Sequence, residues 1–162
     1  VVPQFASSTD DAKVSALETN LANIRSAIDL YYQQHGAYPS ADISSGGTCG
    51  GTAGTGAANS VAAFLDQLAY YTNASGQSCT QKDDGLGNAL AFPYGPYLKK
   101  RSLPANPITN DDDLQIVTTG SLTPTVDALG KGWKFDNVSG KFFANDDTDP
   151  DAGGPELPYN QR

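Results

Sequence analysis

The sequence predicts an α+β fold in which a long amphipathic N-terminal helix packs on a small antiparallel β-sheet. Three observations indicate this fold: a helical repeat of apolar residues near the start, a glycine-rich stretch after it, and strand and hairpin patterns towards the end. With 162 residues, 38% of them hydrophobic, the chain can bury one modest core, so we expect a single domain over 1–162.

The long helix is expected over 1–36, because apolar residues recur there at alternating intervals of three and four and therefore share one helical face. Polar and charged residues, including Arg25, occupy the opposite face. The face that we expect to enter the core consists of Val14, Leu17, Leu21, Ile24, Ile28 and Tyr31.

The stretch "HGAYP" is expected to end this helix. Gly36 can take the left-handed conformation that closes many helices, and Pro39 prevents continuation. His35, the only histidine, falls in the last turn. In that position we expect its partly positive imidazole to complement the negative end of the helix dipole. We do not expect it to act as a catalytic base, because the sequence specifies no partner for one.

Residues 37–58 are rich in Gly, Ser, Thr and Ala and are expected to form a long loop. This loop contains Cys49, and the second cysteine is Cys79. We predict a disulfide between them, which on a chain-entropy argument stabilises the fold by roughly 3–4 kcal/mol. Such a bridge implies an oxidising compartment. The alternative is a pair of unrelated free thiols.

The remaining elements are shorter. A helix is expected within 59–73, capped by Asn59 or Ser60, and an antiparallel sheet region within 90–145. Prolines interrupt the start of that region, "LQIVTT" reads as a strand rich in β-branched residues, and "GWKFDNVSGKFF" reads as a hairpin.

An acidic tail is expected over 146–162. Asp147, Asp149 and Asp151 have the 1, 3, 5 spacing that hard cations favour, although an EF-hand would also need Gly and Glu at later positions that hold Ala152 and Pro158. We therefore weigh a possible calcium site against a solvated tail. A second acidic cluster, "NDDD", is expected to form a turn before the strand.

Composition excludes several functions. The net charge of −8 disfavours nucleic acid and anionic lipid surfaces, and the basic run Lys99–Arg101 is too short to reverse this. The sequence has no Ser/His/Asp set, no cluster of metal-ligating histidines and no phosphate-binding loop. We expect a protein that is not an enzyme and that needs no cofactor other than possible calcium.

Several motifs in order carry a family resemblance. "VVPQFASSTDDAKVSALETNLANIRSAIDLYYQQHGAYPS", "YGPYLKKRSLPANPIT" and "GWKFDNVSGKFF" together resemble type IV pilin-like proteins, particularly the major pseudopilins of type II secretion. The resemblance implies a pilin-like fold. It also implies that the chain is a severed head, with a membrane-embedded half-helix of roughly 20 apolar residues upstream. Val1, Val2, Pro3 and Phe5 look like the seam after that half.

The implied function is structural. Family members are held in the bacterial inner membrane, face the periplasm, and then stack through their N-terminal helices into a periplasmic or cell-surface filament with the help of a secretion or pilus assembly machinery. The family also makes the acidic tail a more natural place for calcium, since major pseudopilins bind calcium in a C-terminal loop. The alternative is a minor or tip subunit that acts as an adhesin or binds a secreted substrate.

Overall fold

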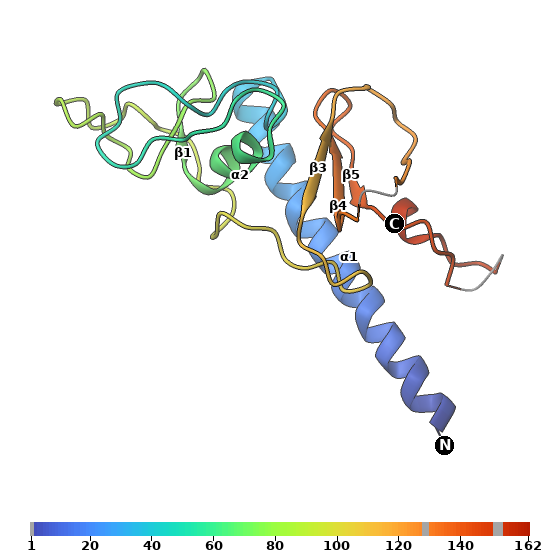
Figure 1. Cartoon of the computed structure of the whole chain (residues 1–162). Helices are drawn as coiled ribbons and strands as arrows, with labels where there is room; N and C mark the ends of the chain where they lie inside the picture. Colours follow the sequence, from blue (N-terminus) through green and yellow to red (C-terminus); the bar gives the residue numbers. More distant parts are fainter. Residues whose placement is uncertain (1, 128–129, 151–153) are drawn as a thin grey trace.

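The computed structural model describes residues 2–127, 130–150 and 154–162, with side chains from Asp10 onward. It is an α+β protein with one long helix, a two-stranded sheet and a three-stranded sheet among the described residues (Figure 1). In chain order the elements are α1 (Val2–His35), α2 (Val61–Ala69), β1 (Tyr71–Thr72), β2 (Ser78–Cys79), β3 (Leu114–Val117), β4 (Trp133–Asp136), β5 (Phe142–Ala144) and the 3₁₀-helix η1 (Tyr159–Gln161).

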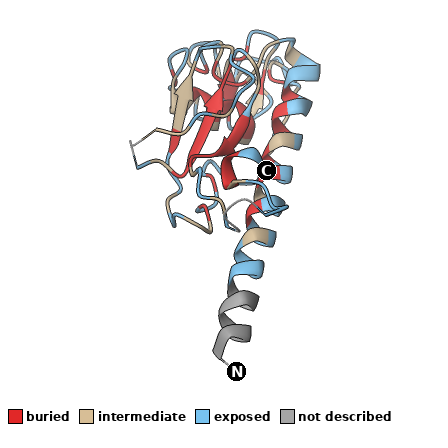
Figure 2. Cartoon of the chain, turned by 90° about the vertical axis from the view of Figure 1, so that its right-hand side faces the viewer, coloured by how far each residue is buried: buried red, intermediate tan, exposed pale blue. Residues whose placement is uncertain are grey.

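Helix α1 agrees closely with the range predicted for it. Its 34 residues correspond to a length of about 50 Å at the usual rise per residue. From Val14 onward α1 lies against the rest of the protein (Figure 2), while its N-terminal part projects beyond the head (Figure 1). Gly36 closes the helix as expected, at φ +72°, and its N–H donates to the Tyr32 carbonyl.

The three-stranded sheet has the order β3-β4-β5 and is mixed rather than wholly antiparallel. β4 and β5 form the predicted antiparallel hairpin, with Phe135 opposite Phe142. β3 instead runs parallel to β4, with Ile116 opposite Phe135. Parallel strands need a long connection that returns the chain to the same end of the sheet, and residues 118–132 provide it.

The core lies between α1, α2 and this sheet. The buried face of α1 meets Phe64 and Leu68 of α2 and the aromatic side chains of β4 and β5. Trp133 is fully buried, and its indole N–H donates to the Pro104 carbonyl. The largest fully buried side chains are Trp133, Tyr31, Phe64, Phe92, Phe135 and Phe142.

A lobe without a large core of its own extends from the α2 side of the molecule, on the left of Figure 1. It comprises the glycine-rich loop, the β1–β2 pair and the irregular segment up to residue 97. Helix α2 is shorter than the predicted 59–73, because strand β1 begins at Tyr71. Ser60 is its N-cap and accepts from the Ala63 N–H, as one of the two predicted caps.

Candidate functional site

The N-terminal half of α1 is the first candidate functional surface. The side chains of the predicted seam, Val1, Val2, Pro3 and Phe5, lie outside the described residues, although the backbone from Val2 onward is helical. The exposed segment next to the head consists of Asp10, Asp11, Ala12 and Lys13. None of the described helices is long and apolar enough to cross a membrane.

The second half of α1 is fixed firmly in the head. Five of the six residues predicted for its core face, namely Leu17, Leu21, Ile24, Ile28 and Tyr31, are at most 2% exposed, and Val14 packs partly buried at the edge of the core. Burial of these apolar side chains anchors the helix, since each contributes about 1.5–3 kcal/mol when it leaves water. The head therefore holds the projecting half in a fixed direction.

Arg25 adds a polar anchor that sequence reasoning placed on the solvent face. Its Nε donates to the Phe142 carbonyl of β5 at 3.0 Å, and its Nη2 donates to the Arg162 carbonyl at 2.6 Å. Because β5 is an edge strand, this contact satisfies a carbonyl that points away from the sheet. Burial lowers the pKa of the Arg25 guanidinium.

His35 is the last residue of α1, but its ring is held by hydrogen bonds and stacking rather than by the expected interaction of a partly positive imidazole with the helix dipole. Its Nδ1 is 3.0 Å from the Tyr31 carbonyl, and its Nε2 is 2.9 Å from Thr72 Oγ1. The ring also stacks on Tyr31, with centroids 3.9 Å apart. Desolvation by burial lowers the pKa of His35, which favours the neutral imidazole, and the two hydrogen bonds of the ring join α1 to strand β1.

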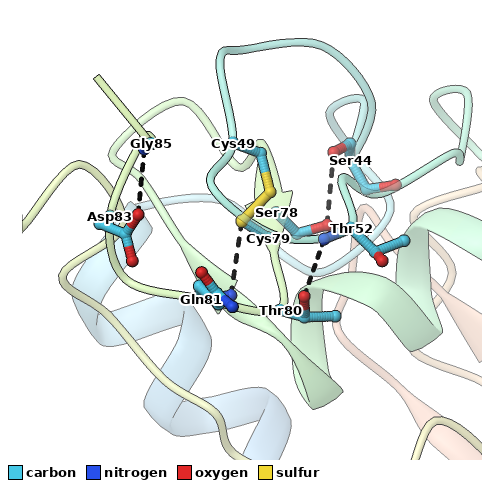
Figure 3. Close-up of a disulfide and its surroundings, with 9 residues drawn as sticks. All are labelled: Ser44, Cys49, Thr52, Ser78, Cys79, Thr80, Gln81, Asp83 and Gly85. Atoms are coloured by element: carbon cyan, nitrogen blue, oxygen red, sulfur yellow. Dashed lines mark hydrogen bonds between the residues drawn. A yellow bond between two sulfur atoms is a disulfide. The ribbon is translucent and has the colours of Figure 1, made fainter.

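The predicted disulfide between Cys49 and Cys79 is present, with the two Cα atoms 5.7 Å apart (Figure 3). Cys79 is fully buried in β2, whereas Cys49 lies on the partly exposed loop. Backbone bonds flank the bridge: the Thr80 N–H donates to the Thr52 carbonyl, and the Ser78 N–H donates to the Ser44 carbonyl. The loop is thus pinned to β2 along its length as well as by the covalent bond.

Asp66 is a further anchor of this loop, and sequence reasoning missed it. The side chain is buried in α2, and its Oδ2 accepts from Ser44 Oγ at 2.7 Å and from the Thr55 N–H at 2.8 Å. Its Oδ1 accepts from Arg101 Nε in an ion pair. The only signal in the sequence is a carboxylate within the otherwise apolar helix "VAAFLDQLA", close to a loop rich in backbone donors.

Gly56 shows why that loop needs glycine. The backbone passes so close to the start of α2 that a Cβ at Gly56 would lie 2.1 Å from the Ala63 nitrogen. Its N–H donates to Ser44 Oγ at 2.8 Å and to Asp66 at 3.3 Å. The glycine-rich composition therefore serves close packing of the loop on α2, in agreement with the absence of a phosphate-binding motif.

The acidic positions are separated in the structure. Asp147 is exposed, Asp149 is partly buried, and Asp151 lies outside the described residues, so the calcium expectation stays a prediction. Asp111, Asp112 and Asp113 place carboxylate oxygens within 4.8 Å of one another. Asp111 Oδ1 accepts from the Asp113 N–H, and Asp113 binds Lys131 Nζ at 2.9 Å. The backbone turn itself lies just before this cluster, at residues 107–109, rather than at the predicted 110–113.

The chain matches no protein-family model, no curated protein and no solved structure. Both nitrogens of the single histidine are occupied by structural contacts, and the conspicuous buried polar groups, Asp66 and Gln67, hold loops in place. The arrangement is suited to presenting a rigid helix and a disulfide-pinned lobe to other molecules.

Proposed function

We propose that the chain is a pilin-like structural subunit of an extracytoplasmic helical filament, either a type IV pilus or a type II secretion pseudopilus. The observation that supports this most is the division of α1, which packs on the head from Val14 onward while its N-terminal part projects as a continuous helix (Figure 1). A helix that projects alone gains stability mainly by packing against another surface. Copies of the same helix would provide that surface.

The disulfide supports a location outside the cytoplasm, because such bonds persist in oxidising compartments. In this proposal the subunit waits in the bacterial inner membrane with its head in the periplasm, held there by an apolar segment upstream of Val1. An assembly machinery then stacks the subunits through their N-terminal helices. The role needs neither a catalytic group nor a cofactor, and it involves no nucleic acid.

The lobe pinned by the disulfide favours one alternative within the same class. A minor or tip subunit could use that lobe as an adhesin or to bind a secreted substrate. Stoichiometry separates the two: a major subunit makes up most of the purified filament, whereas a tip subunit is present in only a few copies.

The experiment that tests the proposal is filament assembly by the gene product in its host, with Phe5→Glu as the variant. We expect the amount of filament recovered by shearing the cells to fall by about tenfold or more, because a charge at a helix-packing seam must be desolvated. Ser26→Glu, on an exposed position of the buried half of α1, is the matched control and should assemble normally. Normal filaments from the Phe5 variant, or no filaments from the unmodified protein, would contradict the proposal.

A further inference from the structure

An exposed apolar loop extends from the lobe. In residues 83–90, here called the knob, Leu86 is 79% exposed and Leu90 is 64% exposed, which makes Leu86 the most exposed of the large apolar side chains described. The segment lies at the end of the lobe farthest from α1, on the left of Figure 1. Isolated exposed leucines are common, but here two lie on one projecting loop, four residues apart in sequence.

The knob is held in one shape by its own hydrogen bonds. Asp84 Oδ1 accepts from the N–H groups of Leu86 and Asn88, and the Asp84 N–H donates to the Asn88 carbonyl. The Leu90 N–H donates to Asn88 Oδ1. Preorganised loops lose less conformational entropy when they bind. The two leucines are therefore presented on a defined turn.

The charge of the knob is negative. Asp83 and Asp84 are its charged residues, and their side chains accept backbone N–H groups of the turn. The nearest basic residue in sequence, Lys82, places its ammonium over the ring of Tyr71, 5.3 Å from the centroid. Neither Asp83 nor Asp84 forms an ion pair with a described residue.

A pocket of opposite character lies elsewhere on the head. A pocket of about 370 Å³ that is open to solvent is lined by Leu98, Lys99, Lys100, Ser102, Leu103 and Pro104, and it is here called the basic pocket. Lys99 and Lys100 are exposed and form no ion pair with any described residue. The following residue, Arg101, is instead committed to Asp66.

The walls of the basic pocket are fixed to the core. The Leu98 N–H donates to the Leu68 carbonyl at 2.8 Å, and the Pro104 carbonyl accepts from the Trp133 indole at 2.8 Å. Leu103 is 6% exposed and forms part of the core. The pocket therefore combines a rigid apolar floor with two unpaired ammonium groups at its rim.

We propose that the knob of one copy of this chain docks into the basic pocket of the next copy. The match is one of charge and polarity: two leucines flanked by carboxylates meet an apolar pocket flanked by lysines. In a chain with net charge −8, whole copies repel one another, and the only basic run is the one that lines this pocket.

This proposal rests on the proposed filament function, which it extends to the contacts between heads. The knob and the pocket are different surfaces, so the contact is head-to-tail, and its repetition builds an open helix unless the rotation closes a ring. A contact of this size is weak between free heads. It becomes effective when the N-terminal helices hold neighbouring heads at high local concentration.

The first experiment is cross-linking with a bismaleimide between Lys82→Cys, immediately before the knob, and Ser102→Cys, so that both leucines of the knob are kept. Both positions are exposed, and both native cysteines are in the disulfide. The heads are tethered by an N-terminal affinity tag to vesicles, so that all helices point the same way. A chain carrying both substitutions should give a ladder of trimers and larger species, whereas products that end at the dimer would overturn the open contact.

Charge exchange tests the specificity of the contact. Lys99→Glu together with Lys100→Glu, or Ala89→Lys in the knob, should each lower the cross-linking yield by about tenfold, and combining the two changes on facing copies should restore it. Circular dichroism and a thiol titration that detects only the introduced cysteines, with Cys49 and Cys79 still bridged, serve as folding controls. Cross-linking yields that do not change in the charge variants, or cross-links only to an unrelated protein, would overturn the proposal.

The same variants distinguish this proposal from the proposed function. Normal filaments without the cross-link would refute the knob contact and leave the filament role standing. A charge-dependent ladder on vesicles, together with a failure of the gene product to form filaments in its host, would refute the filament role and retain the contact. The absence of both would overturn both.

Discussion

Replacement of the buried carboxylate of Asp66 should loosen the glycine-rich loop and destabilise the whole head. In the native protein this side chain binds Ser44, the Thr55 and Gly56 N–H groups, and Arg101. Asp66→Ala removes all of these contacts and leaves a small void at the base of the loop. Asp66→Asn keeps an acceptor for the loop donors but turns an N–H group towards the guanidinium.

The expected loss in the free energy of unfolding follows from the individual contacts of Asp66. A hydrogen bond to a charged group contributes about 1.5–3 kcal/mol, so the two short bonds from Ser44 and Thr55 set the scale. The Gly56 N–H keeps Ser44 Oγ as an acceptor, and Thr55 is exposed enough to bind water instead. The Arg101 side chain is 38% exposed, so its pairing adds little. We expect a loss of about 3 kcal/mol for Asp66→Ala and about 1 kcal/mol for Asp66→Asn.

Urea unfolding followed by tryptophan fluorescence measures this loss. The only tryptophan, Trp133, is fully buried and reports on the core. With a slope of about 2 kcal/mol per molar urea, the midpoint for Asp66→Ala should fall by about 1.5 M. Arg101→Met is the matched control and should cost less than Asp66→Ala, because the carboxylate keeps its loop donors. A loss below about 1 kcal/mol for Asp66→Ala would refute the reasoning.

Two further predictions concern the lobe and the end of α1. Reduction of the Cys49–Cys79 bridge, or its replacement by two serines, should lower the free energy of unfolding by roughly 3–4 kcal/mol in the same assay; two thiols titrated in the untreated native protein would contradict the bridge. Because burial lowers the pKa of His35 in the folded state, its contribution to stability is present above the unfolded pKa and is lost as the pH falls through the folded one. The difference in the free energy of unfolding between the native protein and His35→Phe should therefore be smaller at pH 5 than at pH 7.5. These pH values lie about 1.5 units below and about 1 unit above the usual pKa of histidine. A difference that does not depend on pH would exclude a neutral buried imidazole.

Elements that depend on neighbouring residues could be predicted from the sequence. The buried face of α1, the Ser60 cap and the β4–β5 hairpin follow from periodicity and turn chemistry within a few residues. The disulfide was predicted because the only two cysteines lie in polar, glycine-rich segments with few apolar residues that could bury free thiols. In each of these cases local sequence and tertiary structure favour the same conformation.

Features that join distant segments could not be predicted in this way. The parallel pairing of β3 with β4 depends on the path of residues 118–132, which carry no regular pattern. Arg25 was assigned to solvent from its helical position, but its long side chain reaches the edge of β5. Asp66 satisfies donors from a loop at least ten residues away in sequence. A single sequence does not reveal which buried polar atoms will meet.

Because α1 is one continuous helix, it fixes the rotational orientation of the head about the helix axis. No proline or glycine breaks it between residue 4 and His35, so the projecting end and the buried end turn together. Inserting a single residue near Asp11 would rotate the head by about 100° about the helix axis and move it by about 1.5 Å along the axis, relative to a partner bound to the projecting end. In the proposed filament, the number of residues between the two ends, more than their identity, would therefore determine which side of each head faces the neighbouring copy.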